Sequence, residues 1–414
     1  MKKFIMFMGI LLLLFIGFLV FDSYTFSIIP ILDIEDSNIE IDKLYIYGTH
    51  LNMEGNYTLD SDSELVLYNG KFLSYKVNIN DGKFNFSEYV NDGIYLDDIP
   101  KGKYYLFFRT KYVNEEGIEE YKYYPLKNNT KYKDTIYYTM SNYEKKIVIS
   151  NEDSYPTMMM KIEKVKNDNV YDIVLDPGHG GRDGGANNKG YQETDFTLDI
   201  ATKLIKKLED EGFKVKLTHE IGELSSTKKL PEYGIHGRAV IPREVNAKYL
   251  FSIHLNSSSA DYVNGLEVYT AKNINYDFAK LLVNNITMNT GIKYSKNKIN
   301  KIYDSIYSRN FTDIEVKESI EDYIEDDFKP YDITTNSNYY YMIRETGGVI
   351  TGAYVDNRNS DKMYNPYVDS NVGTETYLLE LGYISNPSDL DNMVNNRDKF
   401  INAIYKSIKT LKDW

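Results

Sequence analysis

Apolar positions in the C-terminal part of the chain follow two alternating periods. Residues 171–176 form an apolar run, and the next segment places residues such as Phe196 and Ile200 four apart, the spacing of a helix with one buried face. Gly212 follows where such a helix would end. Further strands are predicted at 213–220, 249–257, 265–271 and 376–385, and further helices at 237–248, 276–290 and 398–411. This alternation predicts an α/β domain over residues 170–414, with a mostly parallel sheet flanked by helices.

Residues 41–165 show a different pattern. Short alternating segments, rich in β-branched and aromatic residues, are separated by turn sequences such as YNGK, NDGK and PKGK. Several strands at this spacing predict an all-β, sandwich-like domain. No catalytic constellation is visible in it. We therefore expect the chemistry to reside in residues 170–414, and a chain beginning near residue 165 to fold alone.

The first segment of the chain is a long apolar run preceded by two lysines. Lys2 and Lys3 precede the uncharged run 4–21, whose length is near the lower limit for a helix that crosses a bilayer. The run ends without the small residues of a signal-peptide cleavage site. We predict an uncleaved signal anchor, a transmembrane helix over residues 1–21, followed by a linker over 22–40; cleavage and secretion are the alternative. The basic N-terminal side places the rest outside the cytoplasm, so we expect a single-pass protein of the cell membrane.

Charge and composition narrow the class of partner. The chain has 48 Lys and Arg against 61 Asp and Glu, a net charge of −13. Nucleic acid is therefore not expected as a partner, because its binding proteins carry a basic stripe. The absence of cysteine excludes disulfides, thiolate nucleophiles and cysteine-ligated metals.

Two of the chain's five histidines follow predicted strands. His179 comes after the first strand, within the segment GHGGRDGG, and His254 lies near the end of the third. Because the carboxyl ends of parallel strands meet at one edge of a sheet, both imidazoles can reach one metal ion. A catalytic zinc site has three protein ligands and one open position, and Glu193, at the start of a helix, is the candidate third ligand. Glu380 lies in an apolar strand, where a carboxylate needs a partner or a function; it is the candidate general base for a zinc-activated water.

Each of these signals is weak when taken singly. A glycine cluster can also form an ordinary turn or a phosphate loop, but the G-x-G-x-x-G and G-x-x-x-x-G-K-[ST] patterns are absent here, and H-E-x-x-H is absent too. Two strand-end histidines and two acids in one α/β unit favour the metal interpretation.

Five segments carry a resemblance to a known family. They are IVLDPGHGGRDGGA, ETDFTLDIATKL, SIHLNS, GLEVYT and LLELGYISNPSDL, in this order. Together they resemble the zinc-dependent N-acetylmuramoyl-L-alanine amidases of the type-3 amidase family, over about residues 170–413. The resemblance implies hydrolysis of the amide bond between N-acetylmuramic acid and the L-alanine of the peptidoglycan stem peptide. It also implies these site residues: zinc ligands His179, Glu193 and His254, catalytic Glu380, and substrate-binding Arg344.

The chain departs from the family pattern in an acidic insertion at about residues 292–342. Residues 311–328 within it are crowded with carboxylates, and nothing in the core of the fold requires the insertion, so one expectation is a solvated helix and loop on the surface. The resemblance suggests a lid that places a carboxylate at the zinc, and the alternative is a solvated wall of the substrate groove.

Two other functions remain open from the sequence. One is a zinc carboxypeptidase-like or deacetylase activity on peptidoglycan, and the other is a non-catalytic, anchored wall-binding protein. Analysis of reaction products distinguishes the enzymes. The sequence identifies no regulatory protein partner.

Overall fold

The computed structural model describes most of the chain beyond its N-terminus. The described residues are 32–35, 39–57, 59, 63–80, 82–86, 94–128, 134–138, 144–150, 157–165, 171–219, 237–272, 274–325, 333–351 and 372–412. The predicted signal anchor over residues 1–21, including the apolar run 4–21, lies outside these ranges, as does most of the predicted linker. Within the described ranges, no helix has the length and hydropathy that a membrane span requires.

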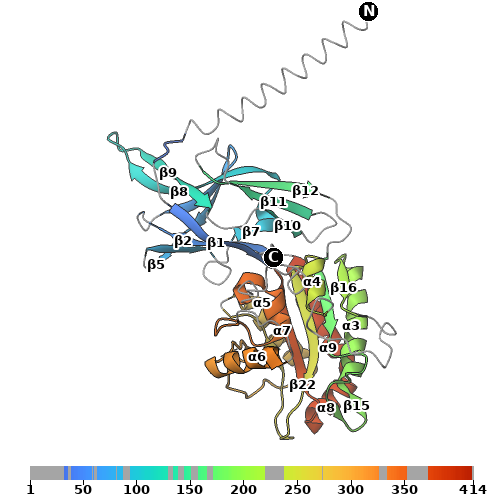
Figure 1. The fold of residues 1–414 in the computed structure, drawn as a ribbon. Helices are drawn as coiled ribbons and strands as arrows, with labels where there is room; N and C mark the ends of the chain where they lie inside the picture. The colour runs from blue at the N-terminus through green and yellow to red at the C-terminus, as the bar shows by residue number, and fades with distance from the viewer. Residues whose placement is uncertain are drawn as a thin grey trace, which may run out of the picture.

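Residues 39–165 form the β-rich part, drawn in the upper half of Figure 1. Its strands are β1 (Ile39–Tyr47), β2 (His50–Asn56), β3 (Glu64–Tyr68), β4 (Phe72–Lys76), β5 (Asn78–Asn80), β6 (Lys83–Phe86), β7 (Ile94–Tyr95), β8 (Gly102–Val113), β9 (Glu119–Asn128), β10 (Asp134–Tyr138), β11 (Glu144–Ser150) and β12 (Met159–Val165). These strands form two antiparallel groups, one that contains β1 and β2 and one that contains β8 and β9. The two groups are joined because β1 and β9 pair in parallel. One apolar core contains side chains from both groups, for example Leu51 and Phe108, and hydrogen bonds join both groups into a single sheet; the sandwich stays a prediction.

The α/β part holds a mixed sheet with strands in the order β16–β13–β17–β22–β18–β20–β19. Their bounds are β13 Ile173–Pro177, β16 Val215–Leu217, β17 Tyr249–Asn256, β18 Glu267–Tyr269, β19 Lys301–Tyr303, β20 Ile306–Tyr307 and β22 Glu375–Tyr383. Neighbours are parallel from β16 through β22. β18 is antiparallel to β22, and β19 is antiparallel to β20. The sheet is thus parallel at its centre, as predicted, and mixed at one edge.

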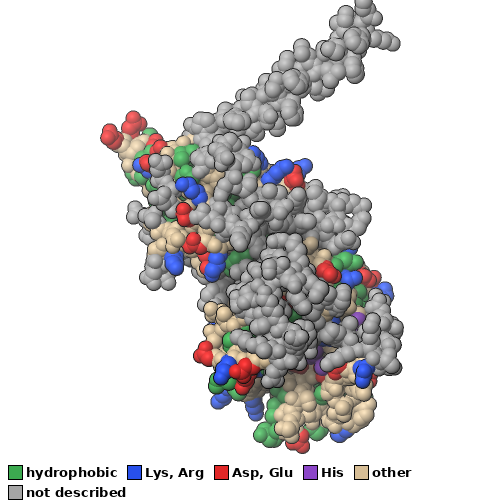
Figure 2. All heavy atoms as spheres, in the orientation of Figure 1, with side chains coloured by type: hydrophobic (Ala, Val, Ile, Leu, Met, Phe, Trp, Pro, Cys, Tyr) green, Lys and Arg blue, Asp and Glu red, His purple; other side chains and the backbone are tan. Residues whose placement is uncertain are grey.

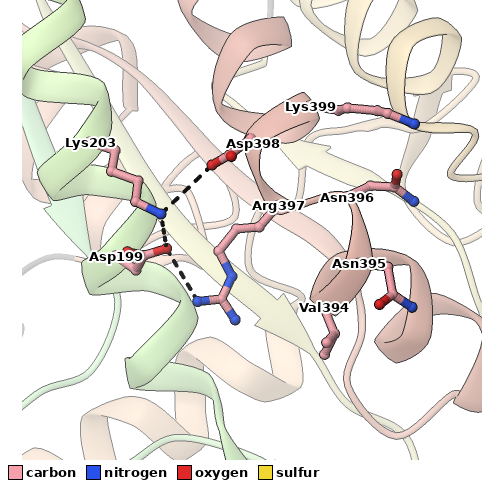
Figure 3. A pocket seen from close by; sticks show the side chains of 8 residues that line it. All are labelled: Asp199, Lys203, Val394, Asn395, Asn396, Arg397, Asp398 and Lys399. Atoms are coloured by element: carbon pink, nitrogen blue, oxygen red, sulfur yellow. Dashed lines mark hydrogen bonds and ion pairs between the residues drawn. The ribbon is translucent and has the colours of Figure 1, made fainter.

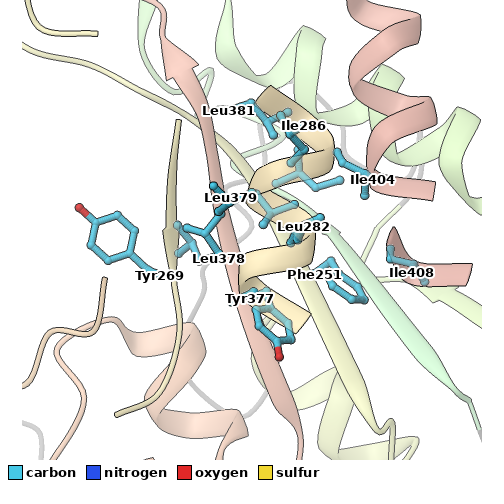
Figure 4. Close-up of a cluster of buried hydrophobic side chains, with 14 of the residues drawn as sticks. Phe251, Tyr269, Leu282, Ile286, Tyr377, Leu378, Leu379, Leu381, Ile404 and Ile408 are labelled. Carbon is cyan, nitrogen blue, oxygen red and sulfur yellow. The ribbon is translucent and has the colours of Figure 1, made fainter. Parts of the chain in front are cut away.

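Helices cover both faces of this sheet. The bounds are α3 Glu193–Asp210, α4 Val240–Glu244, α5 Asp277–Thr290, α6 Asp313–Glu325, α7 Tyr341–Thr346, α8 Pro387–Asn395 and α9 Arg397–Lys409. Helices α3, α5 and α9 share the larger core with β17 and β22, whereas Met342 of α7 packs with Leu250 of β17 in a separate cluster. Figure 4 shows Leu282 and Ile404 on one side of β22 and Tyr269 on the other. The candidate site lies on the face of the sheet that α4 and α7 cover. Leu250 and His254 are four residues apart on β17, so their side chains point to the same face.

Helix α3 confirms the predicted amphipathic segment. Its buried face includes Phe196, Ile200 and Leu204, at the spacing of the helix repeat. The chain leaves the helix at Gly212, whose φ of 88° lies in the left-handed region that glycine adopts without a steric penalty.

The acidic insertion is not wholly a surface addition, and this corrects the expectation for residues 292–342. Ile306 and Tyr307 form β20, and both are buried beside β18, so part of the segment completes the sheet. This strand could hardly be predicted from the sequence, because β20 is only two residues long. Helix α6 follows on the surface, where acidic and basic side chains lie side by side (Figures 1 and 2).

The β-rich part and the α/β part share a core. Tyr45 and Tyr47 of β1 belong to the apolar cluster of the α/β part, and β1 pairs in parallel with β21 (Val372–Gly373). Gly48 also donates its N–H to the carbonyl of Gly373 at 3.0 Å. The strand β22, which carries Glu380, begins directly after this junction. A chain beginning near residue 165 would lose these contacts, so we expect it to be less stable than the whole protein.

Replacing Gly373 by Val is expected to weaken this junction. A Cβ at this position would lie 2.5 Å from the carbonyl oxygen of Gly347 and 2.9 Å from the ring of Tyr47, so the strands must separate. We expect the free energy of unfolding to fall by about 1–3 kcal/mol, measured by thermal or denaturant unfolding. Val113→Ala is the control, since Val113 is 64% exposed. An unchanged melting temperature for Gly373→Val would show that the two parts are not coupled there.

Candidate active site

The loop after β13 takes a tight path that places His179 at the edge of the sheet. His179 has a φ of 65°, a left-handed conformation that is uncommon for residues other than glycine and often found at functional sites. A Cβ on Gly178 would lie 2.3 Å from the ring of His254, and one on Gly185 would lie 2.6 Å from the ring of His179. The glycines therefore make room for both imidazoles.

Glu193 lies between the two imidazoles. Its Oε2 is 3.1 Å from Nε2 of His179, and its Oε1 is 3.1 Å from Nδ1 of His254. One donor atom from each of the three residues lies within 4.8 Å of the other two. The N–H groups of Ala186 and Leu255 hold the carboxylate in this orientation. The structure thus brings together all three predicted metal ligands.

Asp183 lies behind His179 and was not predicted. Its Oδ2 is 2.9 Å from Nδ1 of His179, and its Oδ1 accepts a hydrogen bond from the N–H of Gly185. A carboxylate in this position orients an imidazole and leaves its other nitrogen for a metal. The spacing of four residues suggests this contact only in a helix, and here it arises from a glycine-rich loop.

We call His179, Glu193 and His254 the cluster. The charges in and around it shift the pKa of each of the three residues. Burial opposes protonation of His179, but the hydrogen bonds and charges of Glu193 and Asp183 outweigh it and raise the pKa to about 9. Burial likewise opposes ionisation of Glu193, yet hydrogen bonds from His179 and His254 hold its pKa far below the usual range. Despite burial, Glu193 and Glu380 raise the pKa of His254. The carboxylates of Glu193, Asp183 and Glu380 therefore favour positive charge in this part of the structure.

Glu380 lies on β22 directly beside His254 of β17. Its Oε2 atom is buried and has no hydrogen-bond partner among the described residues. Burial raises the pKa of Glu380 to about 7; the charge of His254 opposes this, and the charges of Glu193 and Glu267 add to it. A buried carboxylate oxygen without a donor is rare in folded proteins and indicates a place where a bound molecule donates.

Glu267 lies across from Glu380 on β18 and was also not predicted. This buried carboxylate is fully partnered by four donors: Asn256, Tyr269, Ser295 and Tyr383. Two neighbouring acids thus have opposite environments, one satisfied and one with a free oxygen. The sequence could not show this, because the antiparallel register of β18 against β22 decides it.

Arg344 lies on α7 and is 4% exposed. Its Nη1 donates to the carbonyls of Asn338 and Tyr339 at 2.8 and 3.0 Å, so the side chain fixes the backbone that precedes Tyr340. The structure therefore commits Arg344 to internal contacts, and its predicted contact with substrate stays a prediction.

The lid interpretation of residues 311–328 also stays a prediction. In the described part of this segment, Glu315 pairs with Arg309 and accepts hydrogen bonds from Thr312. The side chains at 322–325 and the residues 326–328 lie outside the described part.

A hollow of about 460 Å³ with a charged lining lies where α3 meets α9. Asp199 pairs there with Lys203 and Arg397, and Lys203 also approaches Asp398 at 3.7 Å (Figure 3). These charges neutralise one another, and the hollow contains none of the predicted site residues. We assign it a structural role in joining the two helices.

The fold and the site define an α/β protein with a candidate metal site at one edge of its sheet. Two imidazoles and a carboxylate converge at the carboxyl edge of parallel strands, and a carboxylate with a free oxygen lies beside them. Two histidines and a glutamate are a known ligand set of catalytic zinc, and the residues present therefore fit that metal.

The comparison with known families agrees with this class. A profile of the N-acetylmuramoyl-L-alanine amidases matches residues 173–410. The chain belongs to this family, and it is an N-acetylmuramoyl-L-alanine amidase, an enzyme whose substrate is peptidoglycan. The match spans the α/β part and leaves the β-rich part outside it.

Relatives and solved structures match a similar share of the chain. A putative N-acetylmuramoyl-L-alanine amidase of Buchnera aphidicola is 28% identical over 246 residues, 57% of this chain and 94% of the relative. The germination-specific amidase of Bacillus subtilis is 25% identical over 249 residues, 57% of this chain and 77% of the relative. Among solved structures, the amidase AmiC2 of Nostoc punctiforme is 23% identical, with a TM-score of 0.37, and the match covers 58% of this chain and 97% of that one.

Proposed function

We propose that this amidase uses a zinc ion held by His179, Glu193 and His254, with Glu380 as the general base. The observation that carries the proposal is the free, buried Oε2 of Glu380 beside the three convergent donors. A base needs an oxygen that is not already engaged, and it must lie next to the place where the attacking water is held.

The division of labour follows from the positions of these residues. When bound, zinc would polarise the scissile carbonyl and favour deprotonation of the attacking water. Glu380 takes the proton from that water and then passes it to the departing amine of L-alanine. Burial raises the pKa of the Glu380 carboxyl, which strengthens this group as a base. Asp183 keeps His179 in the orientation that faces Glu193.

We further propose that the apolar run 4–21 anchors the protein in the cytoplasmic membrane and that the α/β part faces the cell wall. The support is the sequence: a run without charge, preceded by two lysines. An acidic enzyme with an anionic polymer as substrate is not retained by charge, so an anchor would keep it local. Proteolysis of intact cells from outside tests this orientation.

The test of the reaction is the identity of the products. The purified protein should release stem peptides with a free L-alanine amino terminus from peptidoglycan, detected by mass spectrometry. It should also contain one zinc per chain, and a chelator should stop the release until zinc is restored. Release of a terminal amino acid or of acetate would contradict the proposed bond specificity.

A further inference from the structure

A hollow of about 410 Å³ lies beside β18, and none of its lining residues has a role in the proposed reaction. Its lining includes Tyr269, Asn297, Asn300, Arg309, Glu315 and Tyr340; we call it the Arg309 pocket. Tyr269 belongs to β18, and the other five residues come from the segment at about residues 292–342. The segment at about residues 292–342 therefore supplies most of the named lining of the Arg309 pocket.

The Arg309 pocket adjoins the proposed base through its two tyrosines. The rings of Tyr269 and Tyr340 are 4.5 Å apart, and the hydroxyl of Tyr269 donates to Glu267 at 2.7 Å. Glu267 is the cross-strand neighbour of Glu380. Figure 4 shows the ring of Tyr269 pointing away from α5 and α9, toward the face of the sheet that also carries His254. Tyr269 and Glu267 thus link the lining of the pocket to Glu380.

Arg309 supplies the positive charge of the pocket. Its guanidinium carbon lies 3.5 Å from the centre of the Tyr339 ring, and its Nη2 pairs with Oε1 of Glu315 in the first turn of α6. A guanidinium binds carboxylates through paired, directed hydrogen bonds. The contact with Glu315 thus shows that Arg309 can bind a carboxylate here.

The contact between Arg309 and Glu315 can exchange without unfolding α6. The two side chains are 31% and 24% exposed, so a second carboxylate can reach the guanidinium from solvent. The other oxygen of Glu315 accepts hydrogen bonds from the N–H and the hydroxyl of Thr312, both at 2.9 Å. Glu315 would keep these contacts, and the start of the helix would stay capped, while Arg309 turned to another partner.

We propose that the Arg309 pocket binds a free carboxylate of the stem peptide, and that Glu315 occupies Arg309 when no substrate is bound. This inference rests on the proposed function, which places the scissile amide at Glu380. The glycan strand of peptidoglycan offers hydroxyls and amides, whereas its free carboxylates belong to the stem peptide. A cationic anchor therefore selects the peptide side of the scissile bond. In a chain of net charge −13, a local cation also offsets repulsion of an acidic ligand.

The direct test is Arg309→Gln with two matched ligands. One is a soluble muramoyl peptide with free carboxylates, and the other is the same compound with its carboxylates converted to amides. The dissociation constant of the free acid should rise about 10–100-fold, because charge-assisted hydrogen bonds are lost, and that of the amide should not change. Arg309→Lys should fall between, since lysine keeps the charge but not the paired donors.

Glu315→Gln should have the opposite effect. Without the competing carboxylate, Arg309 is free for substrate, and the free acid should bind about 2–5-fold more tightly. Lys317→Gln is the control for Arg309→Gln, because it removes the same charge from an exposed position on α6 and should leave both dissociation constants unchanged. Thermal melts of each variant verify that the fold is intact.

Binding is measured in the Glu380→Gln background, so that the ligands are not consumed. If turnover persists in that background, the proposed base is wrong, whatever the pocket does. If turnover stops but Arg309→Gln weakens the binding of both ligands equally, or of neither, the pocket does not bind a carboxylate selectively. The inference then fails. Selective loss of the free acid together with the gain in Glu315→Gln supports it.

Discussion

Replacing His254 by Ala is expected to abolish zinc binding and amide hydrolysis together. His254 is buried, and its Nδ1 lies 3.1 Å from Glu193, so it is a rigid member of the donor set. Removal leaves one imidazole and one carboxylate, and a zinc site with only two protein ligands is not a stable catalytic site. We expect zinc affinity to fall by more than about 100-fold, beyond the loss typical of residues that only support a ligand. Metal analysis after dialysis and the rate of stem-peptide release measure the two effects.

Asp183→Asn is expected to lower zinc affinity less than His254→Ala does, and the two variants are compared directly. Asp183 contacts His179 but is not itself one of the three proposed ligands, so its replacement should weaken zinc affinity by about 10–100-fold and leave activity at saturating zinc largely intact. Asp195→Asn is the matched control, because Asp195 is an exposed acid in the same first turn of α3 as Glu193. Full zinc occupancy in His254→Ala would contradict the proposed ligand set.

The convergence of the cluster could be predicted from the sequence because it depends on a general property of parallel sheets. His179 follows β13, and His254 lies near the end of β17; these strands are parallel neighbours. Their carboxyl ends therefore meet at one edge. Glu193 reaches the same edge because α3 begins there. No detail of packing had to be known.

The residues that surround the cluster could not be predicted in this way. The contact of Asp183 depends on the left-handed φ of His179, and the placement of Glu267 depends on the register of β18 against β22. The junction of β1 with β21 joins residues more than 300 positions apart along the chain and carries no local signal. These contacts depend on tertiary structure, which the periods of apolar residues do not encode.

The same limit explains the interpretation of the acidic insertion. Its composition indicated a solvated helix, and α6 is one, with Ile314 69% exposed. The strands before it are too short to give an alternating pattern, so their place in the sheet became visible only in the structure. Arg309 lies between these strands and α6, and neither composition nor motif distinguished it from other surface arginines.

Replacing Glu380 by Gln is expected to stop hydrolysis while zinc stays bound. The amide has nearly the shape of the carboxylate but cannot accept a proton from water, so the loss falls on the chemical step and not on assembly of the site. Loss of a general base lowers the rate by about 100–10,000-fold; we expect kcat to carry this change and KM to move little. Zinc content should equal that of the unmodified protein, because Glu380 is not among the three convergent donors. Glu318→Gln makes the same chemical change on exposed α6 and should be silent in both measurements. If Glu380→Gln lost zinc as fully as His254→Ala, Glu380 would be a ligand, and the base would have to be sought elsewhere. If it kept both zinc and rate, proton transfer would not depend on this carboxylate, and its free, buried oxygen would need another explanation.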